Sequence, residues 1–146
     1  MTSIHEFVRE SNRIEGITRD PTEAEIVATA AFIEIPEVRI ESLCQLVDVY
    51  QPGHRLRDIV GLNVRVGSHV PMPGGPMVRV VLSSILHDMT SPWRQHIAYE
   101  TLHPFTDGNG RSGRALWLWQ MTRQHGGAPL GFLHHFYYQT LENTDR

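Results

Sequence analysis

Apolar residues recur at helical spacing along most of the chain, and proline and glycine interrupt the pattern. Near the start, Ile4, Phe7, Val8 and Ile14 fall on one face of a helix, and Gly16 follows as a stop signal. The same pattern, with its cap and breaker residues, predicts further helices over about residues 21–31, 36–49, 77–89, 91–102, 111–124 and 130–141. The chain is therefore predicted to be a mainly α-helical bundle.

The stretch between the third and fourth predicted helices has a different character. Residues 63–70 alternate between apolar and polar side chains around a central Gly-Ser pair, which predicts a short hairpin with a glycine-led turn. Three prolines follow between residues 71 and 76, and each lacks the N–H that a growing sheet needs. We therefore expect one short β-hairpin, over about residues 62–71, on an otherwise helical domain.

Length and composition indicate one soluble domain. The chain has 146 residues, 40% hydrophobic and 20% charged, which suffices for one core, so we expect residues 1–146 to form a single domain. The net charge of -3 argues weakly against nucleic acid as a partner. Cys44 is the only cysteine, so no internal disulfide is possible. No signal peptide or bilayer-spanning stretch is evident, so we expect a cytoplasmic protein with no membrane partner.

The most informative segment is the loop before the helix predicted at residues 111–124. Gly108, Asn109 and Gly110 tolerate left-handed backbone and let a ligand approach closely. They precede a helix, whose first N–H groups and positive dipole end favour an anion. Arg111 and Arg114 are three residues apart on that helix, so their guanidinium groups are expected to reach one polyanion.

Two further residues of the loop add chemistry to this anion site. Asp107 is its only carboxylate, and Mg²⁺ is commonly held by one carboxylate together with phosphate oxygens. His103 is the nearby group that can accept a proton near neutral pH. Each feature has a plainer structural interpretation, as a turn, a solvated face or a structural histidine. Taken together, they predict a site for a metal-bound polyphosphate with a base beside it.

The segment resembles the motif of the Fic family, His-x-Phe-x-Asp/Glu-Gly-Asn-Gly-Arg-x-x-Arg. Every specified position of that motif is filled, by His103, Phe105, Asp107, Gly108, Asn109, Gly110, Arg111 and Arg114. The resemblance implies a protein adenylyltransferase, which transfers AMP from Mg·ATP to a Tyr, Thr or Ser hydroxyl of a target protein and releases pyrophosphate. We expect the Phe105 side chain to point into the core.

The resemblance also implies a role for each residue of the loop. His103 is the general base, and Asp107 holds Mg²⁺ between the α- and β-phosphates. The ATP-binding segment runs from Asp107 to Arg114 and thus includes Ser112 and Gly113. Within it, the backbone of Gly108 to Gly110 and the Asn109 side chain cradle the α- and β-phosphates, Arg111 contacts the β-phosphate, and Arg114 contacts the γ-phosphate.

The predicted hairpin is similar to the flap of the same family, which borders the nucleotide and receives the target as an added strand. The resemblance assigns Val64, Arg65 and Val66 to target binding, and it places Val66, Gly67, Ser68 and His69 beside ATP. A plain surface hairpin is the structural alternative.

The end of the first predicted helix is similar to the Fic inhibitory motif, Ser/Thr-x-x-x-Glu-Gly/Asn. Ser11, Glu15 and Gly16 fill its specified positions, and Ser11 and Glu15 share one helical face. The resemblance implies the N-terminally inhibited class of the family, in which residues 1–17 form an inhibitory helix and Glu15 pairs with Arg114, denying that arginine to the γ-phosphate. The alternative is an ordinary capped helix with a solvated carboxylate.

Other interpretations remain open on the sequence alone. The segment around Tyr137 resembles a family segment beside the adenine pocket, which implies that Tyr137 contacts the adenine of ATP. The same site also suits removal of AMP from a modified target, transfer of another phosphate or nucleotide group, or a regulatory module that binds nucleotide without turnover. His87 and Asp88 are expected at an exposed helix end, and Trp117 and Trp119 in the core. The target and the oligomeric state, including a possible homo-oligomer, do not follow from the sequence.

Overall fold

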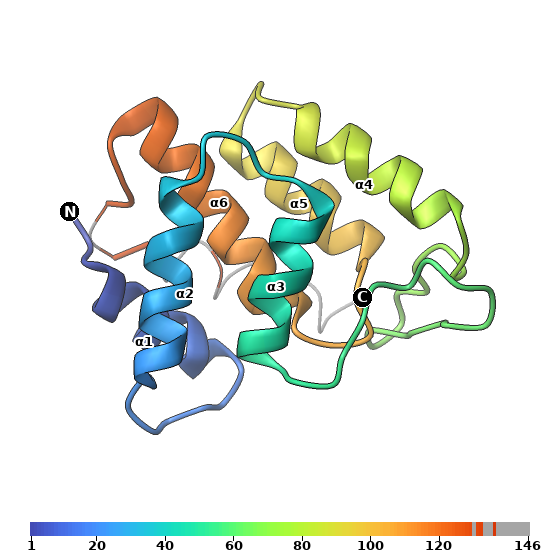
Figure 1. The fold of residues 1–146 in the computed structure, drawn as a ribbon, viewed down its shortest axis with the longest axis horizontal. Coiled ribbons are helices and arrows are strands. Elements are labelled where there is room, and N and C mark those ends of the chain that lie inside the picture. Colours follow the sequence, from blue (N-terminus) through green and yellow to red (C-terminus); the bar gives the residue numbers. More distant parts are fainter. Residues whose placement is uncertain (130, 133–135, 137–146) are drawn as a thin grey trace.

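The computed structural model describes residues 1–129, 131–132 and 136. That part of the chain contains six helices (Figure 1), which are α1 (Ile4–Ile14), α2 (Glu23–Glu34), α3 (Ile40–Tyr50), α4 (Met77–His87), α5 (Pro92–Leu102) and α6 (Asn109–His125). The mainly helical class predicted from the sequence is confirmed. The helix predicted over residues 130–141 lies almost wholly outside the described residues. No helix in the described ranges is both long and apolar enough to cross a bilayer.

Helix α6 is the centre of the bundle. It packs against α1, α2, α3 and α5, and α4 packs on α5 and α3 (Figure 1). Every residue from 111 to 120 is buried, so α6 contacts neighbours on all sides and its first turn is held rigidly. Trp117 and Trp119 lie in the core as predicted, whereas His87 and Asp88 are exposed at the end of α4.

Local sequence explains where several helices begin. Ser3 caps α1 by accepting from the Glu6 N–H, and Thr22 forms a reciprocal capping box with Glu25 at the start of α2. Ser91 accepts from the Arg94 N–H at the start of α5, where Pro92 is the first helical residue. The cap of α5 matches the predicted start, whereas α2 begins at Glu23, slightly later than the start predicted near residue 21.

The connection between α3 and α4, residues 51–76, has no helix and lies at one side of the molecule (Figure 1). The hairpin predicted there is reduced to one bridge, in which Val66 and His69 exchange two backbone hydrogen bonds of 2.9 Å. The residues on either side of the bridge are largely exposed, and those after it lead directly into the proline-rich segment. The ladder therefore does not extend beyond this bridge. The flap is therefore a closed turn with unpaired backbone on either side.

Candidate active site

The loop that joins α5 to α6 is bounded by two residues with left-handed backbone. His103, at the C-cap of α5, has φ 53°, and Gly108, at the N-cap of α6, has φ 79°. A positive φ is uncommon for a residue with a Cβ, so surrounding contacts must hold His103 in place. One such contact is the hydrogen bond of 2.9 Å from its N–H to the Tyr99 carbonyl.

Phe105 and Asn109 fix the shape of this loop from inside. The Phe105 ring is 1% exposed, as predicted. The Asn109 carboxamide accepts from the Phe105 N–H and donates to the Phe105 carbonyl, both at 2.8 Å. The Asn109 side chain, which is predicted to cradle phosphate, thus has one backbone partner at each end of its carboxamide, and the residue is 2% exposed.

Ser112 and Gly113, the next residues of the predicted ATP-binding segment, lie against α5. The Ser112 hydroxyl is fully buried, with bonds to the Gly108 carbonyl at 2.8 Å and the Tyr99 hydroxyl at 2.7 Å. Gly113 faces Tyr99 and Glu100 on α5 so closely that a Cβ would collide with them. Both residues therefore contribute to the close contact between α5 and α6.

The start of α6 retains the properties of an anion site. Its N-cap, Gly108, makes no side-chain cap, so the first N–H groups, at residues 109–111, have no intrahelical partner. They add to the positive end of a seventeen-residue helix dipole. The backbone, more than the side chains, can therefore bind phosphate here.

Asp107 is placed to meet a cation at the mouth of the loop. One carboxylate oxygen accepts from the Gly108 N–H at 2.7 Å, and the side chain is 56% exposed. The other oxygen lies 3.8 Å from Nε2 of His54. Within the described ranges, no three His, Cys, Asp or Glu side chains gather as a ready-made metal site. The arrangement fits Mg²⁺ only as a shared ligand of Asp107 and phosphate oxygens.

His103 carries a half-buried imidazole whose pKa is lowered from 6.5 to about 4. Burial is the main cause, and the positive charge of Arg57 adds to it, although the Glu100 backbone carbonyl and the Asp107 carboxylate act in the opposite direction. The imidazole is thus neutral at about pH 7 and has a lone pair available to accept a proton.

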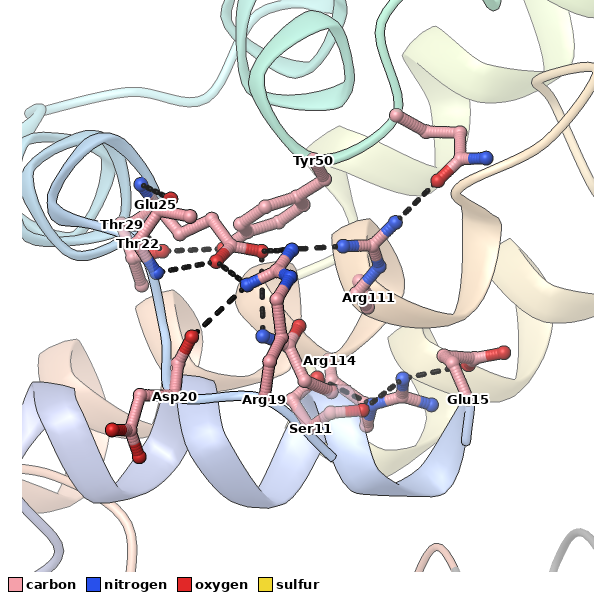
Figure 2. A network of polar contacts seen from close by, with 12 residues as sticks. Ser11, Glu15, Arg19, Asp20, Thr22, Glu25, Thr29, Tyr50, Arg111 and Arg114 are labelled. Carbon is pink, nitrogen blue, oxygen red and sulfur yellow. Dashed lines mark hydrogen bonds and ion pairs between the residues drawn. The ribbon is translucent and has the colours of Figure 1, made fainter. Parts of the chain in front are cut away.

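Arg114 is bound to the first helix by three hydrogen bonds (Figure 2). Its Nε donates to the Ser11 hydroxyl at 2.8 Å, and Nη2 donates to the Ser11 carbonyl at 3.0 Å and to Glu15 Oε1 at 2.7 Å. The pair that the resemblance implies is therefore present. Glu15 Oε1 also lies directly over Gly110, where a Cβ would collide with it, so this carboxylate sits against the helix start. Gly16 follows with φ 77° and ends α1.

Arg111 is buried like Arg114, but its guanidinium has partners from α2 and α3 and the residue that follows α3. Its Nη2 donates to Gln51 Oε1 at 2.7 Å, its Nη1 lies 3.4 Å from Glu25 Oε2, and its guanidinium stacks over the Tyr50 ring. Figure 2 shows Glu25 between Arg111 and Arg19, whose Nη1 donates to it at 2.8 Å. Burial alone would raise the Glu25 pKa, but hydrogen bonds from Arg19 and Thr22 hold it at about 2.

Glu25 and Gln51 are not identifiable from the sequence as partners of the loop, nor is Arg57 identifiable as a buried cation. The only sequence signal for Glu25 was its place in a capping box, which indicates a helix start and nothing about α6. Arg57 is fully buried in a segment without helical or alternating periodicity, so no pattern marked it.

The flap residues lie beside the end of α5. His69 bonds through Nε2 to the Thr101 carbonyl at 2.9 Å, which ties the turn to that helix, and Val66 is 39% exposed. Arg65 donates back to the Gly67 carbonyl at 3.0 Å. Val64 precedes the bridge, and Ser68 lies within it. Tyr137, the expected adenine contact, lies outside the described residues.

Comparison with known proteins agrees with this geometry. The model of the Fic/DOC family matches residues 85–121, a segment that covers α5, the loop and most of α6. A search of curated proteins finds no match. This segment of the chain is similar to the Fic/DOC family.

Proposed function

We propose that this protein is an adenylyltransferase that moves AMP from Mg·ATP to a Tyr, Thr or Ser hydroxyl of a target protein. The match of residues 85–121 to the Fic/DOC family suggests a transferase of this type. The observation that carries the specific proposal is the pairing of an uncapped helix start at Gly108 with a neutral imidazole at His103. The first suits a polyphosphate, and the second suits removal of a hydroxyl proton.

In the proposed reaction, His103 takes the proton from the target hydroxyl while the hydroxyl oxygen attacks the α-phosphorus. A new P–O bond forms to the target, the bond between the α-phosphorus and the bridging oxygen breaks, and pyrophosphate leaves with those electrons. The N–H groups at the start of α6 stabilise the negative charge on the phosphates. Mg²⁺ held by Asp107 together with phosphate oxygens would neutralise part of that charge.

The flap supplies the proposed docking site for the target. Val64, Arg65 and Val66 lie in an exposed or half-buried turn with unpaired backbone on either side of a single bridge. An extended target segment can pair with such backbone, which presents a hydroxyl without a deep specificity pocket.

Glu15 is the proposed inhibitor of this reaction. Its carboxylate pairs with Arg114 and lies against Gly110, so it takes up positive charge that the triphosphate needs. ATP bound in its presence is expected to adopt an unproductive pose, because the γ-phosphate lacks its arginine. Replacing Glu15 should therefore raise transfer.

The test uses ATP radiolabelled at either the α- or the γ-phosphate. Glu15→Gly incubated with Mg·ATP and a cell lysate should label protein from the α-position only, and Glu15→Gly/His103→Ala should label none. Label from the γ-position alone would identify phosphorylation and overturn the proposal. ATP binding without any covalent product would favour a regulatory module.

Removal of AMP from a modified target is a second candidate, supported by the position of the Glu15 carboxylate inside the site. That carboxylate is 41% exposed while one oxygen bonds Arg114, so it can also orient a water molecule. Loss of AMP from a pre-modified target in wild type, but not in Glu15→Gly, would establish this activity.

A further inference from the structure

Arg57 is the largest fully buried side chain in the described part of the chain, and it lies between the catalytic loop and the flap. No carboxylate in that part of the chain forms an ion pair with it. A buried, unpaired cation is costly unless strong acceptors surround it. The partners of Arg57 therefore indicate why the chain keeps a charge here.

Four backbone carbonyls surround the Arg57 guanidinium. Two of them end α5, where Nε donates to His103 at 2.7 Å and Nη2 donates to Leu102 at 2.8 Å. The other two lie at the ends of the flap, where Nη1 donates to Leu62 at 3.1 Å and to Met72 at 2.9 Å. The planar fork of an arginine can serve such divergent acceptors, which a lysine cannot.

The first pair of bonds bears on the conformation of His103. The last carbonyls of a helix have no intrahelical partners, and a cation at that end also interacts favourably with the dipole. Arg57 meets both conditions at the point where His103 turns into left-handed backbone. The backbone of Arg57 adds to this contact, because its N–H donates to the Pro104 carbonyl at 2.8 Å.

The second pair of bonds closes the base of the flap. Nearby, the Gly75 N–H donates to the Arg57 carbonyl and the Gly74 N–H donates to Asn63 Oδ1, both at 2.9 Å. Gly74 packs so tightly on the backbone of residues 59–62 that no Cβ would fit. The flap therefore leaves the domain from a fixed base centred on Arg57.

We propose that Arg57 is a positioning residue that joins the general base to the target-binding flap, holding the His103 backbone and both ends of the flap in one arrangement. The proposal rests on the proposed function, in which the flap presents the hydroxyl that His103 deprotonates. Misplacing one element against the other by about 1 Å can cost on the order of a hundredfold in rate. A single side chain that bonds both elements removes that freedom.

Three variants separate the fork of Arg57 from its charge. Arg57→Lys keeps the charge and loses the planar fork, and Arg57→Met removes both. Arg55→Gln is the matched control, because Arg55 is 59% exposed and its side chain forms a loose ion pair, 3.9 Å from Asp58. Folding of each variant is verified by circular dichroism.

The first measurement is amide hydrogen exchange at Gly74 and Gly75, which reports on the base of the flap without any assay of activity. Exchange should be at least about tenfold faster in Arg57→Lys and Arg57→Met than in wild type, and unchanged in Arg55→Gln. A folded Arg57→Lys protein with wild-type exchange at both amides contradicts the proposal.

The second measurement is the NMR titration of the His103 imidazole, assigned by its loss in His103→Asn. Besides Arg57, the charged or titratable groups facing this imidazole are His69 on the flap and Asp107 on the loop. Its pKa should rise towards 6.5 in Arg57→Met and stay low in Arg57→Lys and Arg55→Gln. A pKa that is unchanged in Arg57→Met overturns the link to the base.

A third measurement uses the wild-type protein and therefore does not require that the Arg57 variants fold. The guanidinium N–H groups of Arg57 should exchange slowly, in the same opening event as the Gly74 amide. Free rotation of that guanidinium, or opening independent of Gly74, contradicts the proposal even if neither substitution at Arg57 yields folded protein.

Activity then connects Arg57 to transfer. In a Glu15→Gly background, Arg57→Lys should lower kcat/KM for the target about tenfold or more while the Kd for ATP stays within about twofold. A loss confined to ATP binding would contradict the proposal. If Glu15→Gly itself transfers no AMP, the proposed function fails, and the exchange and titration measurements still decide the role of Arg57.

Discussion

Arg114 donates a hydrogen bond from Nη2 to Glu15 Oε1 at 2.7 Å, across the contact between the last helix described and the first. Its Nε also donates to the Ser11 hydroxyl at 2.8 Å. Only 6% of the Arg114 side chain is exposed, so this guanidinium is held by α1 and is not available to a ligand in this arrangement. A phosphate group that uses Arg114 must displace Glu15.

Removing the Glu15 carboxylate should therefore strengthen ATP binding. We expect Glu15→Gln to lower the Kd for Mg·ATP on the order of tenfold, because a neutral amide competes less well for Arg114 and does not repel phosphate. Isothermal titration calorimetry measures this directly. Glu10→Gln, which removes a carboxylate from the same helix away from the loop, should bind as wild type does. Equal Kd values for Glu15→Gln and wild type would exclude the competition.

The low pKa of His103 gives a second prediction, on the pH dependence of transfer. Because the folded-state pKa is about 4, below the usual 6.5, the imidazole stays neutral as the pH falls from 8 to about 5. In a Glu15→Gly background, protonation of His103 should therefore change kcat/KM by less than about twofold across that range. A loss of activity centred near pH 6.5 and assigned to His103 by NMR would contradict a depressed pKa.

Glu25 yields a prediction on stability. It is 2% exposed and accepts from Arg19, Thr22 and Asn12 beside Arg111, so Glu25→Gln leaves two arginines with a weaker acceptor. We expect the free energy of unfolding to fall by about 3 kcal/mol near neutral pH. Urea denaturation measures this loss.

The sign of the pH dependence follows from the lowered pKa of Glu25. Its contribution to stability is fully present above the unfolded value of 4.5 and is lost as the pH falls through about 2. The difference between wild type and Glu25→Gln should therefore shrink from pH 5 towards pH 2. A difference that stays constant over this range would show that the charge of Glu25 is not what stabilises the fold.

For Glu100, we predict the opposite dependence of stability on pH. Among the described residues, its buried Oε1 has no hydrogen-bond partner, and His96 Nε2 lies 3.9 Å away. Burial raises the Glu100 pKa to about 8, although the charge of Arg114 acts against this. The folded state thus retains a proton that the unfolded state releases above about pH 4.5, so stability falls as the pH rises towards 8. Glu100→Gln should be more stable than wild type at pH 8, on the order of 1–3 kcal/mol, and nearly equal at pH 4. Thermal denaturation at both pH values tests this.

The helices follow from the sequence because their signals are local. Proline, glycine and hydroxyl caps mark the ends of α1, α2 and α5 within a few residues, and apolar spacing marks their faces. The loop at residues 103–108 is also predictable from local signals, because its glycine directly precedes the start of a helix in the sequence. The Phe105 ring lies in the core, as predicted from the sequence.

What the sequence does not predict is the set of partners across the fold. Asn109 looks like a ligand residue in the chain, yet its carboxamide is satisfied by the backbone of Phe105 four residues earlier. Arg111 meets Glu25 and Gln51, which are 86 and 60 residues away in sequence. Such contacts depend on how α2, α3 and α6 pack, and periodicity carries no information about them.

The central claim is that the site transfers AMP, and intact-protein mass spectrometry tests it most directly. Purified Glu15→Gly is incubated with Mg·ATP and lysate, and the modified chains are then mapped by peptide fragmentation. The account predicts an added mass of one AMP on a Tyr, Thr or Ser side chain, lost in Glu15→Gly/His103→Ala and weak in wild type. An adduct of a single phosphate, or an AMP adduct that persists without His103, would contradict it.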